Sequence, residues 1–124
     1  MFLLIIISIF IIVFKSFPQI SFESHTVIGG EFTCDGALSV YTIDLDDDGD
    51  MDVLSASADE DKITWFENDG AQNFIGHIIT TNTNGANTVF AIDIDDDSDF
   101  DILSANSFYP DMVCWYENDG NQNF

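Results

Sequence analysis

Two stretches of this sequence nearly repeat each other: GALSVYTIDLDDDGDMDVLSAS at residues 36–57 and GANTVFAIDIDDDSDFDILSAN at residues 85–106. They are identical at 13 of 22 positions. A second pair follows, WFENDGAQNF at 65–74 and WYENDGNQNF at 115–124, identical at 8 of 10 positions. Internal repeats of this length indicate similar supersecondary units that stack side by side.

A third element precedes the first unit. FESHTVI at residues 22–28 resembles FIGHII at residues 74–79, so the phenylalanines at 22, 74 and 124 mark units of 52 and 50 residues. We therefore separate a predicted signal peptide or short membrane anchor, 1–21, from a repeat region, 22–124. The repeat region comprises a leading strand and loop at 22–35, a first repeat at 36–84 and a second, truncated repeat at 85–124.

The segments within a unit have the composition of strands. They are short, rich in β-branched and aromatic residues, and separated by Gly, Asn and Asp. The tripeptide Asn-Asp-Gly at 68–70, repeated at 118–120, is a strong turn signal. Four short strands per unit predict an all-β, β-propeller-type repeat with four-stranded antiparallel blades and two recognisable units, hence an incomplete propeller. The strands expected in the first unit are 40–43, 52–56, 63–67 and 74–79.

The third strand of each unit predicts that its sheet is covered on both sides. In the first unit Ile63 and Trp65 point to one face, whereas Thr64 and Phe66 point to the other. A blade between two neighbouring blades has both faces covered, whereas an antiparallel sheet in a two-layer sandwich leaves one face polar. Cys114 takes the place of Thr64 in the second unit, and we expect it to pack within a strand.

The loop between the first two strands of each unit carries the chemistry. DLDDDGDMD at residues 44–52 holds six carboxylates in nine residues, which repel one another unless a cation lies among them. Hard divalent cations prefer oxygen ligands, and Ca²⁺ accepts six to eight of them from a flexible loop. The predicted first site takes side-chain oxygens from Asp44, Asp46, Asp48 and Asp52 and a backbone carbonyl from Asp50, with Asp47 pointing to solvent. The predicted second site, in DIDDDSDFD at 93–101, takes Asp93, Asp95, Asp97, Asp99 and Asp101.

The two loops differ at one position that matters for the backbone. Gly49 allows the positive φ with which the loop curls around an ion, and Ser98 replaces it in the second loop. A left-handed conformation costs a residue other than glycine about 1–2 kcal/mol. We therefore expect the second site to be weaker, not absent.

An EF-hand is the obvious rival for the D-x-D-x-D-G pattern. It requires a glutamate at loop position 12 and flanking helices. Position 12 is Ser55 in the first loop and Ser104 in the second, and the flanking segments are predicted strands. The EF-hand interpretation therefore fails.

Together, IDLDDDGDMDVL, ITWFENDG and FIGHII resemble the FG-GAP / VCBS-type repeat, a calcium-binding β-propeller blade found in integrin α-chain heads and many secreted microbial proteins. The resemblance covers residues 22–124 and implies an extracellular module with Ca²⁺ loops, used in recognition or adhesion. Family propellers typically close with about seven blades, and two units leave strand edges and apolar faces uncovered. We therefore expect either remaining blades in a longer chain or self-assembly of several copies.

Charge and leader fit this interpretation. The chain has 23 acidic residues against two lysines and no arginine, a net charge of −21, which excludes nucleic acid as a partner because phosphate binding needs clustered cations. The two aspartate loops hold 12 of the 23 acids.

The apolar run 2–14, closed by Lys15, is shorter than a membrane span and has the length of a signal-peptide core, although a short uncleaved anchor remains an alternative. We therefore expect a secreted or cell-surface protein. Cys34 and Cys114 fit no metal signature and leave one disulfide possible.

No set of residues predicts catalysis. His25 and His77 occupy the same repeat position and are expected to be structural, as are Glu67 and Glu117 beside the Asn-Asp-Gly turns. Trp65 and Trp115 are expected in strand packing. The sequence therefore predicts a non-catalytic module that recognises an extracellular protein or glycan. The alternatives are an accessory segment of a secreted carbohydrate-active enzyme and a purely structural unit.

Overall fold

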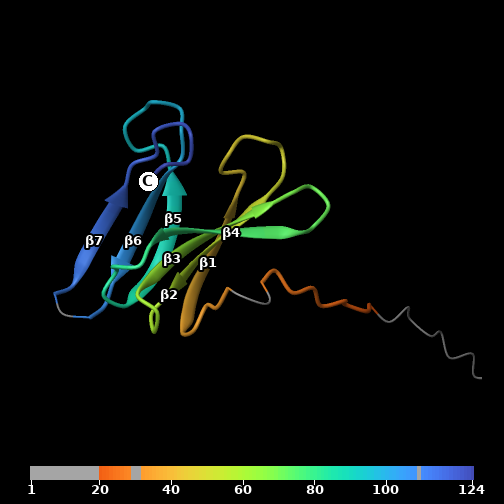
Figure 1. Ribbon diagram of the computed structural model, residues 1–124, viewed down its shortest axis with the longest axis horizontal. Coiled ribbons are helices and arrows are strands. Elements are labelled where there is room, and N and C mark those ends of the chain that lie inside the picture. The colour runs from red at the N-terminus through yellow and green to blue at the C-terminus, as the bar shows by residue number, and fades with distance from the viewer. Residues whose placement is uncertain (1–19, 29–31, 109) are drawn as a thin grey trace, which may run out of the picture.

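A computed structural model of the chain describes residues 20–28, 32–108 and 110–124 (Figure 1). Both sheets keep the strands in chain order, each antiparallel to its neighbour. The described residues contain no helix. The fold is therefore all-β, with two propeller-type blades, as predicted. The first sheet contains β1 (Ala37–Ile43), β2 (Asp52–Ser57), β3 (Lys62–Asn68) and β4 (Phe74–Thr80); the second contains β5 (Ala86–Ile92), β6 (Asp101–Asn106) and β7 (Met112–Tyr116).

The sequence repeat produces the same register in both sheets. Leu54 of β2 lies opposite Trp65 of β3, and Leu103 of β6 lies opposite Trp115 of β7. Both sheets also shift register near the start of their first strand. The observed strands match the expected segments but extend them, because ladder bonds continue into the polar residues that flank each apolar run.

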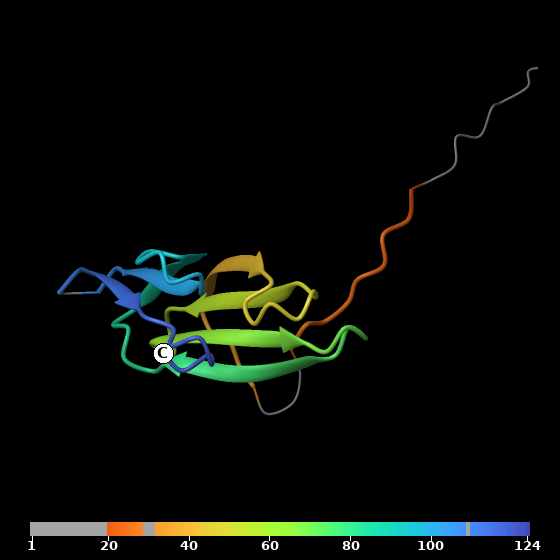
Figure 2. The same cartoon turned by 90° about the horizontal axis from the view of Figure 1, so that it is seen from above.

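The two sheets pack through one face of each. β5 lies against β1 and β2, as the two views of the ribbon show (Figures 1 and 2). Leu54 and Trp65 of the first sheet share a core with Ala91 and Ile102 of the second. The remaining members of this buried core are Leu45, Ala56, Ile63, Ala86 and Val89.

The predicted coverage of both sides of the third strand holds for β3 but not for β7. In β3, Ile63 and Thr64 point to opposite faces and both have an exposed fraction of 0%. In β7 the equivalent of Ile63 is Val113, which is 79% exposed. The prediction was wrong for β7, because within the described residues no element lies against that side of the second sheet.

The N-terminal residues run along the other side of the first sheet. The leading strand expected from Phe22 does not pair with any described strand, and residues 20–28 lie outside the sheets. Further along, Phe32 packs its edge onto the ring of Phe66, with centroids 6.3 Å apart and planes at 82°. Lys62 Nζ donates to the carbonyl of Thr33 over 2.6 Å and pairs with Glu60 over 2.7 Å. These contacts hold the start of the repeat region on β3.

Two further expectations concern the leader and the cysteines. The predicted signal peptide or anchor, with its apolar run 2–14, lies outside the described residues. Among the residues that are described, no helix is long and apolar enough to cross a membrane. Cys34 and Cys114 are both free thiols and half-buried, and Cys114 lies in β7 as expected. The structure therefore holds no disulfide between them.

Candidate metal centres in the aspartate loops

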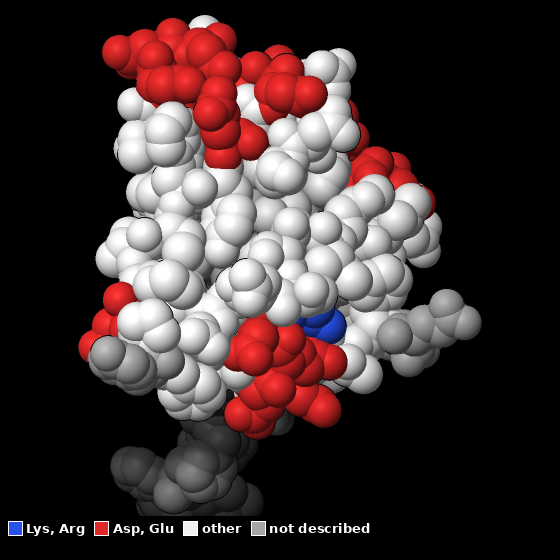
Figure 3. Space-filling view, turned by 60° about the vertical axis from the view of Figure 1, so that its left-hand side comes forward, with Lys and Arg blue, Asp and Glu red and all other residues white. Residues whose placement is uncertain are grey.

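Both aspartate loops project from the same end of the molecule. The β1–β2 loop and the β5–β6 loop lie together at the top of Figure 1, and acidic side chains gather at that end of the surface (Figure 3). A cavity of about 480 Å³ separates the loops, with Asp46 and Asp47 on one side and Ser98 and Asp99 on the other. This cavity was not predictable from the sequence, because it depends on how the two sheets pack.

The first aspartate of each loop organises the backbone around itself. Asp44 accepts the N–H groups of Asp48 and Gly49, each over 3.0 Å, through its two carboxylate oxygens. Asp93 repeats the arrangement with Asp97 at 3.2 Å and Ser98 at 3.0 Å. In both blades the loop therefore curls around this carboxylate.

The next two aspartates form a chain of short turns in the first loop. Asp46 accepts the N–H of Asp48 over 3.3 Å, and Asp48 accepts the N–H of Asp50 over 2.8 Å. The second loop makes the same two bonds, at 3.3 and 3.0 Å. In both loops these two carboxylates thus each accept the amide two residues further along.

The last aspartate of each loop is a buried structural acceptor. Asp52 is fully buried, and its two oxygens accept the N–H groups of Leu45 at 3.1 Å and Asn68 at 2.8 Å. Asp101, also fully buried, makes the equivalent bonds to Ile94 and Asn118 at 3.2 and 2.8 Å. This residue therefore ties the loop to the turn after the third strand. Each carboxylate oxygen keeps a second lone pair that can still coordinate a cation.

Three carboxylates converge in each loop, but the trios differ. In the first loop the converging residues are Asp44, Asp46 and Asp48, whose ligand oxygens all lie within 4.8 Å of one another. In the second loop they are Asp93, Asp95 and Asp101. Oxygens bound to one Ca²⁺ at about 2.3–2.6 Å can be no more than about 5.2 Å apart, so both trios fit a single calcium ion. Asp97, in contrast, lies outside the second trio.

The fifth aspartate of each loop, Asp50 or Asp99, directs its side chain away from the trio. A methyl group added to Gly70 would meet the Asp50 carboxylate at 2.5 Å, and one added to Gly120 would meet Asp99 at the same distance. The carboxylates of Asp50 and Asp99 therefore rest on the Asn-Asp-Gly turns. The expectation that Asp50 offers its backbone carbonyl to an ion stays a prediction.

The backbone conformations confirm the positive φ expected at the Gly/Ser position. Gly49 has φ 98° and Ser98 has φ 81°, so both residues lie in the left-handed region. A Cβ at Gly49 would meet no atom within 4 Å, so the cost of a side chain here is conformational, not steric. The exposed Asp47 and Asp96 also have positive φ, 60° and 64°.

The crowding of carboxylates changes their acidity. Partial desolvation, followed by the charges of Asp48 and Asp52, raises the pKa of Asp46 above its ordinary 3.8. Desolvation and then Asp97 raise the pKa of Asp95 in the same way. Without a cation the carboxylates of each loop thus repel one another, and a bound divalent ion would offset this repulsion.

Sequence reasoning missed the asparagines that brace the loops. Besides donating its N–H to Asp52, Asn68 donates from Nδ2 to the carbonyl of Met51 over 3.1 Å and accepts the N–H of Gly70. Asn118 repeats these contacts in the second blade. Glu67, expected to support this turn, instead pairs with His77, with Oε2 and Nε2 2.7 Å apart. The exact repetition of E-N-D-G was the only signal that could have pointed to Asn68.

Fold and site together define the class as a β-propeller-type repeat with an acidic loop after the first strand of each blade. Residues 44–104 match the family model of the FG-GAP-like repeat. Over these residues the chain is an FG-GAP-type repeat protein, as the sequence motifs indicated. No curated protein and no solved structure matches the chain significantly.

Proposed function

We propose that the chain is a non-catalytic, calcium-binding, extracellular module that recognises a protein or a glycan. The observation that carries the proposal is the duplicated loop, in which three carboxylates converge within 4.8 Å in each of two blades. An isolated acidic cluster is common on protein surfaces. The same backbone bonds at the same spacing in both blades support a loop that is built to hold an ion.

The chemistry of the donors favours calcium over other metals. All the converging atoms are carboxylate oxygens on a flexible loop, which suits a hard cation that tolerates irregular coordination. Extracellular modules often bind calcium at about 10⁻⁴–10⁻³ M, which matches a calcium-rich surrounding. FG-GAP-type repeats occur in extracellular and surface proteins, and this supports the proposed location.

The use of polar side chains supports recognition, not catalysis. The buried Asp52 and Asp101 accept backbone amides, and His77 is held between the ring of Trp65 and Glu67. These groups are committed to structure. Calcium bound at one end of the blades would order the neighbouring loops and so preorganise a surface for a ligand.

The test measures calcium uptake and its effect on stability. Titration calorimetry of the full chain should show calcium binding, and a chelator should lower the melting temperature, because a ligand bound only to the native state stabilises it. Replacing both Asp46 and Asp48 with Ala should abolish the effect in the first loop. Asp47→Ala is the matched control, since Asp47 is exposed and lies outside the trio. An unchanged melting temperature with chelator and in the double variant would refute the calcium assignment.

The recognition step is tested separately. Arrays of extracellular glycans and matrix proteins should show binding by the unsubstituted chain, and the binding should weaken when Asp46 and Asp48 are replaced. Binding that persists unchanged without calcium would separate recognition from the metal loops. An absence of any binding would favour a purely structural module.

A further inference from the structure

The second sheet leaves open the face that the first sheet buries. Trp65 is 4% exposed and Ile63 0%, because their face of the first sheet packs on β5–β7. Their repeat equivalents, Trp115 and Val113, are 46% and 79% exposed. Strand alternation places both on the side of β7 opposite Tyr116, which packs against the core. We call this side, with Leu103, Val113 and Trp115, the open face.

The same sheet also has an open edge. In the first sheet β4 pairs with β3, so that Trp65 lies opposite His77. In the second sheet β7 is the last strand of the described residues, and its outer edge pairs with none of them. An unpaired edge beside an apolar face is a ready template for a strand from another chain.

The N-terminal segment, residues 20–28, has the sequence that such a strand requires. FESHTVI repeats FIGHII of β4, with His25 in the place of His77. The segment is exposed and belongs to neither sheet, with Phe22 91% and Ile20 77% exposed. It leaves the molecule on the side away from β7 in both ribbon views (Figures 1 and 2). The β7 that it would pair with is therefore that of another copy.

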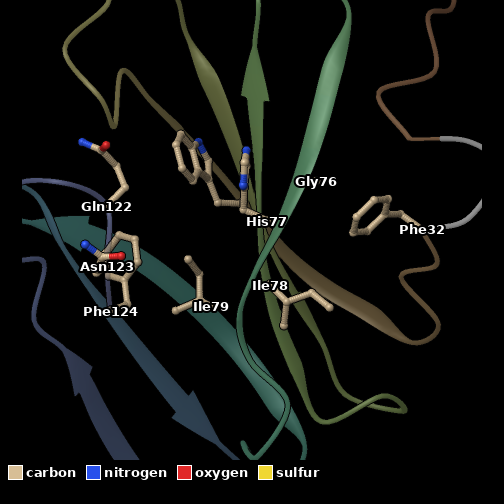
Figure 4. A pocket seen from close by; sticks show the side chains of 9 residues that line it. Phe32, Gly76, His77, Ile78, Ile79, Gln122, Asn123 and Phe124 are labelled. Atoms are coloured by element: carbon tan, nitrogen blue, oxygen red, sulfur yellow. The ribbon is translucent and has the colours of Figure 1, made fainter.

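The segment lies beside the turn after β3 in the first blade as β4 lies beside the equivalent turn of the second blade. His77 and Ile79 of β4 line a cavity of about 540 Å³ with Phe124 of the second blade (Figure 4). His25 and Val27 line a cavity of about 310 Å³ that includes Phe74, the repeat equivalent of Phe124. All five residues that line the smaller cavity have their repeat equivalents in the larger one: His25, Thr26, Val27, Gln72 and Phe74 correspond to His77, Ile78, Ile79, Gln122 and Phe124. The larger cavity is also lined by Trp65, whose equivalent is Trp115 on the open face.

The first sheet has a matching apolar surface beside the segment. Its outer face carries Val40 and Val53, and a cavity of about 340 Å³ there is lined by these residues together with Val27, Ile28 and Phe66. Val40 is 69% exposed. The equivalents of Val40 and Val53 in the second blade, Val89 and Ile102, are buried against the first sheet. Within one molecule, the equivalent of the outer face in the second blade thus packs on the equivalent of the open face in the first blade. The outer face and the open face are therefore matching surfaces.

We propose that the chain associates head to tail with a second copy, whose open face packs on the outer face of the first sheet and whose β7 edge pairs with the N-terminal segment. The β3–β4 register, carried over to β7, places Cys114 opposite Thr26, Trp115 opposite His25, and Tyr116 opposite Ser24. Trp65 and His77 stack with ring centroids 4.5 Å apart, and His77 pairs with Glu67. Between copies, His25 stacks on Trp115 and pairs with Glu117.

The association is heterologous, because the two surfaces in contact differ. In a pair, the first copy therefore keeps its own open face and β7 edge free, and the second copy keeps its N-terminal segment and outer face free. Repetition therefore continues until a ring closes or an open assembly grows. The net charge of −21 opposes the contact, and association strengthens with added salt, which screens repulsion between exposed charges.

The decisive experiment mixes two variants, each blocked at a different end. Trp115→Lys places a charge on the open face. The double change His25→Pro with Thr26→Pro removes two successive N–H groups from the N-terminal segment, one of which points to the partner edge in any strand. All proteins are full chains kept soluble in a non-ionic detergent, and their masses are measured by light scattering and sedimentation.

The unsubstituted chain should form species of at least twice the 13.8 kDa of one chain. Each blocked variant alone should remain a monomer, and an equimolar mixture should give a 1:1 pair and nothing larger. Thr81→Ala, an exposed position in the β4–β5 connection, is the control and should associate like the unsubstituted chain. An unsubstituted chain that stays monomeric, blocked variants that still associate, or a mixture that forms no pair would each overturn the proposal.

Two further variants keep the test sharp. Val113→Lys, at a 79% exposed site, replaces Trp115→Lys should the latter fail to fold as judged by circular dichroism. The proposed contact between His25 and Glu117 is tested by a double-mutant cycle. Glu117→Lys in one copy should weaken the affinity of the 1:1 pair about tenfold or more, and His25→Glu in the partner should restore it. Equal binding by all four combinations would contradict the assigned register. Whether these variants associate does not depend on whether the aspartate loops bind calcium, so a failure of the association proposal leaves the calcium proposal standing, and the reverse.

Discussion

The two repeats share most of their sequence but not their surroundings. Trp65 and Trp115 lie at the same position of the third strand, within the same W-[FY]-E-N-D-G block, yet one is 4% and the other 46% exposed. The aspartate loops show the reverse. They occupy similar positions at one end of the molecule, share nearly all their backbone bonds, and differ at Gly49 and Ser98. Local sequence thus sets the loops, whereas the presence of a neighbouring sheet sets burial.

The largest expected difference between the repeats concerns the tryptophans. Trp65→Ala should lower the free energy of unfolding by about 3–5 kcal/mol, because it removes a large side chain from the core. Trp115→Ala should cost less than about 1 kcal/mol in the monomer, because the side chain is half exposed. Urea denaturation in dilute solution measures both. Equal losses would show that the open face is covered in solution.

A second experiment asks whether the buried aspartates act in the same way in both blades. Asp52→Ala and Asp101→Ala should each cost about 2–3 kcal/mol, since each leaves two backbone N–H groups without their acceptor. The loss should be present in chelator, unlike that of Asp46→Ala, which should appear only with calcium. Asp47→Ala should stay within about 0.5 kcal/mol. If the loss of stability caused by Asp52→Ala vanished in chelator, Asp52 would stabilise the chain mainly by binding calcium and not by accepting backbone amides.

The third comparison exchanges Gly49 and Ser98, the difference between the two loops that affects the backbone. Ser98→Gly should stabilise the chain by about 1 kcal/mol, and Gly49→Ser should destabilise it by about 1–2 kcal/mol, because both positions have positive φ. Ser98→Gly should also tighten calcium binding in the second loop. Thermal melting and calorimetry measure the two effects. Identical calcium affinity before and after the exchange would remove Ser98 as the cause of a weaker site.

The smallest expected effect is a pH dependence common to both turns. Hydrogen bonds from Asn73 and then from the N–H of Ala71 lower the pKa of Asp69 below 3.8. Those from the N–H of Asn121 and then the Asn123 side chain lower the pKa of Asp119. A lowered pKa adds stability that is fully present above 3.8 and is lost as the pH falls through the lowered value.

This pH dependence has a direct test. Asp69→Asn and Asp119→Asn should each be slightly less stable than the unsubstituted chain at neutral pH, and the difference should shrink on acidification below 3.8. Unfolding midpoints followed from neutral to acid pH measure it. A difference that grows toward acid pH would mean that these carboxylates are not held ionised by their turns.

Much of the candidate site was predictable because it is local. The spacing of Asp44, Asp46 and Asp48 within one loop brings their oxygens together through bonds to the next few backbone amides, and the positive φ at Gly49 and Ser98 follows from the same loop shape. The roles of Asp52 and Asn68 were not predictable, since they join segments sixteen residues apart through the β2–β3 pairing.

The sequence by itself determined the repeat, the strand order within a blade, and the family, because strand and turn propensities and loop bonds act over short separations. Tertiary structure alone decided which tryptophan is buried, which oxygens converge in the second loop, and which face and edge stay open. Burial and convergence depend on what packs nearby, and two copies of one motif have the same surroundings only where they have equivalent neighbours.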